Sequence, residues 1–255
     1  KYSEDIIYER VYDVYSTLGY WLDRARPKEE IYKHFREIGK KRFDDGIPLH
    51  EIMKTQILPA HDSHAIPYAL ETLRAGGLVA FPTDTVYGLG CLAFDQAAIE
   101  SIYVAKDRPL EKAIPILIAD VDDLDRVARD LPERARRLAS RFWPGPLTLI
   151  LPKRADLPAA VSATDTVGVR IPDNDIARTL LRAAGPMAVT SANLSGRENP
   201  QTVSEVIRQL DGRIPLVLDG GETRGGVPST VVDVSGAEPV ILREGPITLE
   251  QIKSI

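Results

Sequence analysis

An α/β fold built around a mixed sheet is the architecture that the sequence predicts. Along residues 66–255, short apolar runs typical of strands alternate with amphipathic stretches of helical period. Several neighbouring strand candidates have no helix between them, so parallel and antiparallel pairs are expected to share one twisted sheet flanked by helices. The chain has 255 residues, 44% of them hydrophobic, which suits one sizeable domain with at most a small appendage.

A helical extension is predicted over residues 1–60, before a main domain at 61–255. Apolar residues from Ile6 to Leu18 recur at helical spacing, and Pro27 with the acidic residues after it is typical of a helix start. The stretch from Leu58 to His64 has the turn character of a linker. Because a segment of about 60 residues buries little surface alone, we expect it to pack on the main domain or to form a homodimer.

The main domain is expected to open with a helix over residues 66–73, which stops at Gly76-Gly77, and a strand over 78–81. Asp95 is the expected N-cap of the next helix, and Thr202 with Glu205 forms a capping box before a later one. Helical segments are also expected at about 120–142 and 174–184. Further strands are predicted at 114–118, 147–151, 166–172, 187–190, 216–219, 229–234 and 240–243.

Composition excludes several classes of protein. The net charge is −5, and neither part of the chain has the basic excess of a nucleic-acid module. No apolar run approaches the roughly 20 residues that span a membrane, and the first residues do not form a signal peptide. The single Cys91 suits a reducing compartment, so a cytoplasmic protein is expected.

The positions of the histidines exclude several catalytic mechanisms for most of the chain. All four histidines lie within the first 64 residues. The remaining chain therefore cannot use a histidine general base, a Ser-His-Asp triad or a histidine-ligated metal. No metal site is predicted from the residues.

Polar clusters follow several of the predicted strands and helices. The strand at 78–81 breaks at Pro82 and continues into Thr83-Asp84-Thr85, which on spacing alone fits a plain turn as well as a ligand loop. Arg170 and Arg243 each end an apolar strand, where an anionic partner such as phosphate is expected. The usual P-loop and dinucleotide-binding glycine patterns are absent from the sequence, so neither fold explains these arginines.

Seven motifs in a fixed order resemble the YrdC-like family of threonylcarbamoyl-adenylate synthases over residues 66–247, in its short form without an extra C-terminal domain. They are Phe-Pro-Thr-Asp-Thr-Val-Tyr-Gly-Leu-Gly at 81–90, Lys-Asp-Arg-Pro at 106–109, Phe-Trp-Pro-Gly-Pro-Leu-Thr at 142–148, Val-Arg-Ile-Pro at 169–172, Thr-Ser-Ala-Asn-Leu-Ser-Gly at 190–196, Ser-Thr-Val-Val-Asp at 229–233 and Leu-Arg-Glu-Gly at 242–245.

The resemblance implies a YrdC-like fold and a nucleotidyltransferase that converts L-threonine, bicarbonate or CO2, and ATP into threonylcarbamoyl-AMP and pyrophosphate for tRNA modification. The family signature falls on four catalytic residues: Lys106, Arg108, Ser191 and Asn193. The implied ATP-binding residues are Lys106, Arg108, Lys112, Thr166, Asn193, Thr202 and Arg243. The implied threonine-binding residues are Thr83, Thr85, Arg170, Ser191 and Ser229. Magnesium is expected to be held through the phosphates of ATP, which enters as a substrate.

The implied partners are a downstream tRNA threonylcarbamoyl-transferase machinery and, weakly, tRNA or double-stranded RNA. A membrane partner is not expected. Three alternatives remain at this point: a non-catalytic module of the same fold that binds double-stranded RNA or tRNA, a domain that handles a different carbamoyl-adenylate, and a sensor or dimeriser whose functional part is the helical extension.

Overall fold

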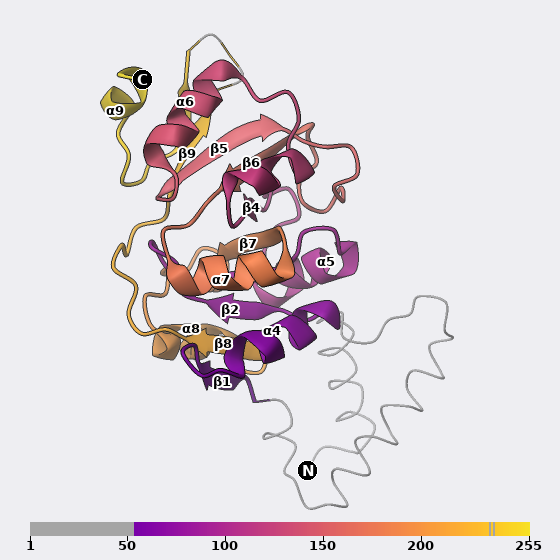
Figure 1. Ribbon diagram of the computed structural model, residues 1–255. Coiled ribbons are helices and arrows are strands. Elements are labelled where there is room, and N and C mark those ends of the chain that lie inside the picture. The colour runs from indigo at the N-terminus through magenta and orange to yellow at the C-terminus, as the bar shows by residue number, and fades with distance from the viewer. Residues whose placement is uncertain (1–53, 235, 237) are drawn as a thin grey trace, which may run out of the picture.

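The structure is a computed structural model that describes residues 54–234, 236 and 238–255. Within these residues a ten-stranded sheet runs through the molecule, in the order β1-β8-β2-β3-β7-β4-β6-β5-β9-β10. Figure 1 shows the sheet extending from β1 at one end to β9 at the other, with helices along it. Of the predicted extension at 1–60, residues 1–53 lie outside the described residues.

The strands are β1 Gln56–Pro59, β2 Val79–Phe81, β3 Gly88–Leu92, β4 Ile116–Leu117, β5 Leu147–Pro152, β6 Thr166–Arg170, β7 Met187–Ser191, β8 Leu216–Asp219, β9 Thr230–Asp233 and β10 Val240–Arg243. The helices are α4 Ala65–Arg74, α5 Gln96–Ala105, the 3-10 helix η1 Val121–Arg126, α6 Glu133–Phe142, α7 Asp175–Ala184, α8 Val203–Leu210 and α9 Leu249–Lys253.

The sheet is mixed, which confirms the predicted fold class. β8 is parallel to both β1 and β2. β3 is antiparallel to β2 and β7, and β4 is antiparallel to β7 but parallel to β6. β5 is antiparallel to β6 and parallel to β9, and β10 closes the other edge antiparallel to β9.

Helices cover the two faces of the sheet through alternating strand residues. Leu216 and Leu218 of β8 share a core with α4 and α7, which lie side by side (Figure 1). Val217, between them, belongs to the larger core, together with α5, α6 and α8. Because successive strand side chains point to opposite faces, this division follows from the period of two.

Further along the sheet, one face lacks this cover. Leu147, Leu149 and Leu151 of β5 pack into the larger core. Thr148 and Ile150 alternate with them, and both line a cavity. The same alternation in β6 sends Gly168 and Arg170 to the cavity.

One helix prediction is wrong, and a second is divided into two elements. Residues 56–58, expected to be helical, belong to strand β1, because β8, about 160 residues away, supplies a parallel partner that local sequence does not reveal. The helical region expected at about 120–142 is confirmed in part, because it consists of two elements, η1 and α6. Pro132 separates them with an extended backbone, and Val127 between them is buried.

The predicted strand at 114–118 shortens to the two residues of β4. Pro115 has no N–H to donate to a ladder, although its carbonyl accepts a hydrogen bond from Val189 N at 2.9 Å. The predicted caps are confirmed: Asp95 accepts from Ala98 N, and Thr202 with Glu205 forms a complete capping box at α8.

Candidate functional site

A cavity of about 280 Å³ opens against β5, β6, β7 and the segment before β9. It brings together predicted site residues from six separate parts of the chain. These are Thr83, Thr85, Arg108, Arg170, Ser191, Ser229 and Arg243. The sequence motifs therefore meet at one place in the fold.

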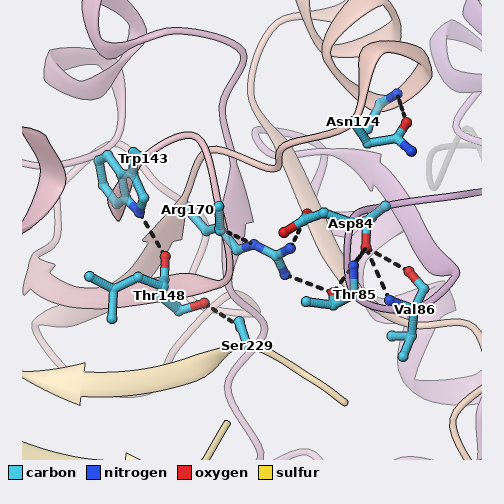
Figure 2. Close-up of polar contacts among 12 residues, drawn as sticks. Asp84, Thr85, Val86, Trp143, Thr148, Arg170, Asn174 and Ser229 are labelled. Carbon is cyan, nitrogen blue, oxygen red and sulfur yellow. Dashed lines mark hydrogen bonds and ion pairs between the residues drawn. The ribbon is translucent and has the colours of Figure 1, made fainter. Parts of the chain in front are cut away.

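Arg170, the last residue of β6, is held by three different groups (Figure 2). Its Nε donates to the Gly145 carbonyl at 3.0 Å and one terminal nitrogen donates to Thr85 Oγ1 at 3.1 Å. The other terminal nitrogen forms an ion pair with Asp84. Burial lowers the pKa of Arg170, while Asp84 opposes the shift and stabilises the cation. The guanidinium is therefore fixed and charged at the cavity wall.

Thr83 and Thr85 form a turn that supports Arg170. Thr83 Oγ1 donates to the Val86 carbonyl at 2.6 Å and lies 3.0 Å from Thr85 Oγ1. Since a hydroxyl has one hydrogen, Thr85 is the donor in the bond between the two threonines. Thr85 Oγ1 therefore accepts the hydrogen bond from Arg170. The hydroxyl of Thr83 bonds within the turn itself.

Arg243 and Ser229 form the opposite wall. The guanidinium of Arg243 donates twice to the Ser229 carbonyl, at 3.0 and 2.8 Å, and once to Ser229 Oγ at 2.9 Å. Ser229 Oγ lies 2.8 Å from Thr148 Oγ1 (Figure 2). Burial lowers the pKa of Arg243, and repulsion from Arg170 and Arg108 lowers it further. The positive charges of Arg108 and Arg170 are thus close enough to Arg243 to repel its charge.

Arg108 is placed by the end of α5. Its Nε donates to the Lys112 carbonyl at 3.2 Å and a terminal nitrogen donates to the Ala113 carbonyl at 2.8 Å. Burial lowers its pKa. Like Arg170 and Arg243, it is positioned by the protein and lines the cavity, so the site has a surplus of positive charge suited to an anionic ligand.

Lys106, predicted to grip phosphate, lies beneath the site rather than on its lining. Its side chain is 1% exposed, and its ammonium contacts the carbonyls of Ser191 and Asn193. Burial, followed by the charge of Arg108, lowers the pKa of Lys106 to about 7. In this arrangement Lys106 holds the end of β7, and contact with ATP stays a prediction.

Asn193 is also buried off the lining. Its Nδ2 donates to the carbonyls of Leu194 and Arg197 at 2.8 and 2.9 Å. Its Oδ1 has no partner among the described residues. Because buried polar atoms are normally paired, a water molecule is the expected partner of this oxygen.

Lys112, Thr166 and Thr202, which were also predicted to bind ATP, do not line the cavity. Thr202 is engaged as the N-cap of α8, where it accepts from Glu205 N. Thr166 Oγ1 lies 2.9 Å from Thr164 Oγ1 at the start of β6, and Lys112 is exposed. Their roles toward ATP remain predictions from resemblance.

Two residues of the site had no assigned role in the sequence prediction. Asp84 lies within the 81–90 motif and Thr148 ends the 142–148 motif, so both were marked by position but not by chemistry. Their partners, Arg170 and Ser229, lie 86 and 81 residues away in the chain. Only the fold reveals these contacts.

Within residues 54–255, apart from the two gaps, no group of three or more His, Cys, Asp or Glu is arranged to hold a metal ion. No helix in the described part of the chain is long and apolar enough to cross a membrane.

Comparison with known proteins identifies similar chains. The family model Sua5/YciO/YrdC, described as telomere recombination, matches residues 71–245, more than half of the chain. A threonylcarbamoyl-AMP synthase of Pyrococcus abyssi (strain GE5 / Orsay) is 46% identical over 185 residues, covering 72% of this chain and 54% of the relative. One of Bacillus subtilis (strain 168) is 45% identical over 193 residues, covering 74% and 56%. This chain therefore spans about half the length of these curated relatives.

A solved structure agrees with the fold. The crystal structure of P. abyssi Sua5 complexed with L-threonine superimposes with a TM-score of 0.76 at 43% identity. The match covers 78% of this chain and 60% of that chain.

Proposed function

Because the chain belongs to the Sua5/YciO/YrdC family, we propose that it forms threonylcarbamoyl-AMP and pyrophosphate from L-threonine, bicarbonate or CO2, and ATP. The observation that carries this proposal is the convergence of Arg108, Arg170 and Arg243 on one cavity lined with hydroxyl groups. L-Threonine, bicarbonate and ATP all carry anionic oxygens, which arginine binds through paired N–H donors.

The proposed reaction needs no covalent enzyme intermediate. The neutral threonine amine nitrogen forms a bond to the carbon of CO2 with release of a proton to solvent, or to the carbon of bicarbonate with loss of water, and gives a carbamate. A carbamate oxygen then attacks the α-phosphorus of ATP, and the bond to the β-phosphate oxygen breaks to release pyrophosphate. Such a step depends on positioning and charge neutralisation, which fixed arginines supply. ATP enters as its magnesium complex, a substrate whose phosphates hold the ion.

Two ends of the cavity suit different substrates. Thr85 and Arg170 at one wall, together with Ser229, are the proposed contacts of threonine. Arg108 and Arg243 are the proposed contacts of the ATP phosphates. Thr85 contacts Arg170 and Ser229 contacts Arg243, so Ser229 would lie between the two proposed ligands.

The product would feed the threonylcarbamoyl modification of tRNA through a downstream transferase. A related protein, P. abyssi Sua5, has been crystallised with L-threonine, and this supports the synthase over an RNA-binding module without catalysis. A cytoplasmic location belongs to the same proposal.

The test is pyrophosphate release by the purified chain with each substrate omitted in turn. We expect release that requires L-threonine, bicarbonate and ATP together. Pyrophosphate release that ignores threonine would overturn the proposal. Steeply salt-sensitive RNA binding without turnover would favour the RNA-binding alternative, because phosphate contacts weaken as salt rises.

A further inference from the structure

Thr148 of β5 is held in one rotamer by its two neighbouring strands. β5 lies between β6 and β9 in the sheet. The Thr148 methyl faces β6, where a Cβ at Gly168 would come within 3.0 Å of it. The hydroxyl faces the opposite side, 2.8 Å from Ser229 Oγ (Figure 2). Because a threonine side chain is stiff at χ1, these two contacts fix where the hydroxyl points.

The hydroxyl groups of Thr148 and Ser229 together carry one hydrogen that is not donated to any described residue. Thr148 and Ser229 each carry one hydroxyl hydrogen, and only one of the two can lie in the bond between them. Among the described residues, Ser229 Oγ has Arg243 as its other partner, and Arg243 is a donor. Within the described part of the chain, neither hydroxyl therefore has an acceptor for the second hydrogen.

Arg243 determines which hydrogen is left over. A hydroxyl that accepts from a cation is polarised and becomes a stronger donor in its next hydrogen bond. Ser229 therefore donates to Thr148 Oγ1, and the Thr148 hydrogen remains available. Thr148 is 2% exposed and lines the cavity, so that hydrogen can be accepted only by something inside the cavity.

The surroundings of Thr148 define the acceptor. Arg108, Arg170 and Arg243 line the same cavity and give it positive charge. Apolar groups such as Pro115 and Ile150 line the floor and offer nothing polar. The acceptor is thus a negatively charged oxygen of a group small enough for a cavity of about 280 Å³.

We propose that Thr148 is a further substrate-binding residue, whose hydroxyl donates a hydrogen bond to an oxygen of a trigonal oxyanion. That oxyanion is either the carboxylate of the amino acid or the bicarbonate that becomes the carbamate. The inference rests on the proposed synthase function and adds to it a chain of hydrogen bonds from Arg243 through Ser229 to Thr148.

The experiment compares Thr148→Val, which keeps the shape and removes the hydroxyl, with Thr148→Ser, which keeps the hydroxyl. Thr148→Ala provides the same loss if the second methyl of valine does not fit beside Ser229. Thr72→Val is the matched control, because it removes a buried hydroxyl that bonds only the Tyr68 carbonyl within α4. Apparent KM values are measured separately for threonine, bicarbonate and magnesium ATP, together with Tm.

We expect the KM of threonine or bicarbonate to rise about tenfold or more in Thr148→Val, the effect of losing a hydrogen bond to a charged group. The KM of ATP should stay within about twofold, and Thr148→Ser should restore most of the loss. A rise for threonine identifies the carboxylate as the acceptor, and a rise for bicarbonate identifies the carbonate oxygen.

The proposal is overturned if folded Thr148→Val and Thr148→Ala leave both KM values unchanged. It is also overturned if the loss of activity only follows a loss of folded protein, or if serine does not restore function. If the wild type itself shows no threonine-dependent pyrophosphate release, the proposed function fails instead. Calorimetric titration of L-threonine and of bicarbonate into wild type and Thr148→Val then still decides whether the hydroxyl binds an oxyanion.

Discussion

Lys106 carries a buried ammonium at the end of β7, where charge is costly. Its two carbonyl contacts compensate part of the lost hydration, but burial still lowers its pKa to about 7. The contacts join α5 to the backbone of Ser191 and Asn193, two residues of the predicted signature. Lys106 therefore acts on the cavity through the strand that forms its wall.

Stability should depend on pH through Lys106. The ordinary pKa of 10.5 applies to the unfolded chain, whereas the folded value is about 7. Between these values the unfolded chain binds a proton that the folded chain does not, so the free energy of unfolding rises with pH. Relative to Lys106→Met, the wild type should gain up to about 1.4 kcal/mol per pH unit over this window.

Urea unfolding of both proteins at several pH values from 7 to 10 measures this slope. Lys153→Met is a matched control, because it removes an ammonium that donates to one carbonyl, that of Ser162, at a half-buried position. Parallel pH curves for wild type and Lys106→Met would contradict the prediction.

Asp84 should matter to the cavity through Arg170, although it is not part of the lining. Both side chains are largely buried, at 13% and 7% exposed. Asp84→Ala leaves the buried guanidinium without its counterion, which is expected to cost roughly 3 kcal/mol of unfolding free energy. Asp84→Asn keeps a hydrogen-bond acceptor and should cost less stability, yet raise the KM of threonine because Arg170 is less firmly held.

Denaturant unfolding and threonine kinetics on both Asp84 variants check this expectation. Asp123→Asn is the comparison, since it alters the exposed ion pair with Arg126 away from the cavity. Unchanged threonine KM in Asp84→Asn would mean that Thr85 and Gly145 suffice to place Arg170.

At this scale the sequence could predict which side chains are chemically unusual but not what they contact. Arg170 and Arg243 were predicted because a charge that ends an apolar strand needs a partner. Lys106 was predicted as a phosphate ligand from the family resemblance. Its burial was not predicted, because it depends on β7, which follows Lys106 by about 80 residues. Contacts across such distances are set by strand order, which local pattern does not contain.

Among the elements, the segment 220–228 crosses the Thr83–Val86 turn and is tied to it. Gly226 N donates to the Thr85 carbonyl at 2.8 Å. A Cβ at Gly225 would lie 2.6 Å from the Asp84 carbonyl oxygen, so this close approach requires glycine. Tyr87 donates to the Gly221 carbonyl at 2.7 Å and accepts from Gly220 N at 3.2 Å.

Tyr87→Phe should loosen this segment. Burial raises the pKa of Tyr87 to about 12, so its hydroxyl stays protonated and donates at physiological pH. Its loss leaves the Gly221 carbonyl without that donor and should reduce stability by about 1 kcal/mol. Amide hydrogen exchange within 219–228 should become faster, because local opening is easier.

Hydrogen exchange measured by mass spectrometry distinguishes this local effect from general destabilisation. Tyr103→Phe is the matched control, because its hydroxyl hydrogen is shared between the carbonyls of Lys112 and Ala160, at 3.1 and 2.9 Å, far along the chain from 219–228. Equal acceleration of 219–228 in both variants would show that the Tyr87 hydroxyl has no specific hold on it.

Element prediction succeeded where periodicity and caps were both present. The helices at α5, α7 and α8 begin after Asp95, Asn174 and Thr202, each of which accepts a backbone hydrogen bond. It failed where a distant strand decides the outcome, as for β1, or where a proline limits pairing, as for β4. Such tertiary effects override local preference.

Across the whole molecule, the cavity lies where helices no longer cover the sheet. α4 and α7 fill one face near β2 and β8, and β5 and β6 present Thr148, Gly168 and Arg170 farther along. The order of motifs predicted that these segments belong together. The alternation along each strand explains why they meet on one face.

The division of the chain into parts can be tested by truncation. The expected boundary near residue 60 cuts through the sheet, because β1 pairs with β8 along four residues. Thr55 also anchors this edge: its Oγ1 donates to the Ile214 carbonyl at 2.8 Å and accepts from Gly212 N at 3.0 Å. A chain that begins at Lys54 keeps these bonds, whereas one that begins at His61 loses them and exposes the unpaired edge of β8.

We therefore expect the chain from Lys54 to retain threonine-dependent pyrophosphate release and nearly the stability of the full chain. The chain from His61 should lose several hydrogen bonds of about 1 kcal/mol each, which lowers Tm by roughly 5–10 °C in a domain of this size. No residue of β1 lines the cavity, so at low temperature the KM of threonine should stay within about twofold in both.

Calorimetric melting and kinetics on the full chain and the two truncated chains check these expectations. Equal Tm for the two truncated chains would show that β1 contributes little to the domain, and lost turnover in a folded chain from Lys54 would place residues 1–53 in the catalytic unit.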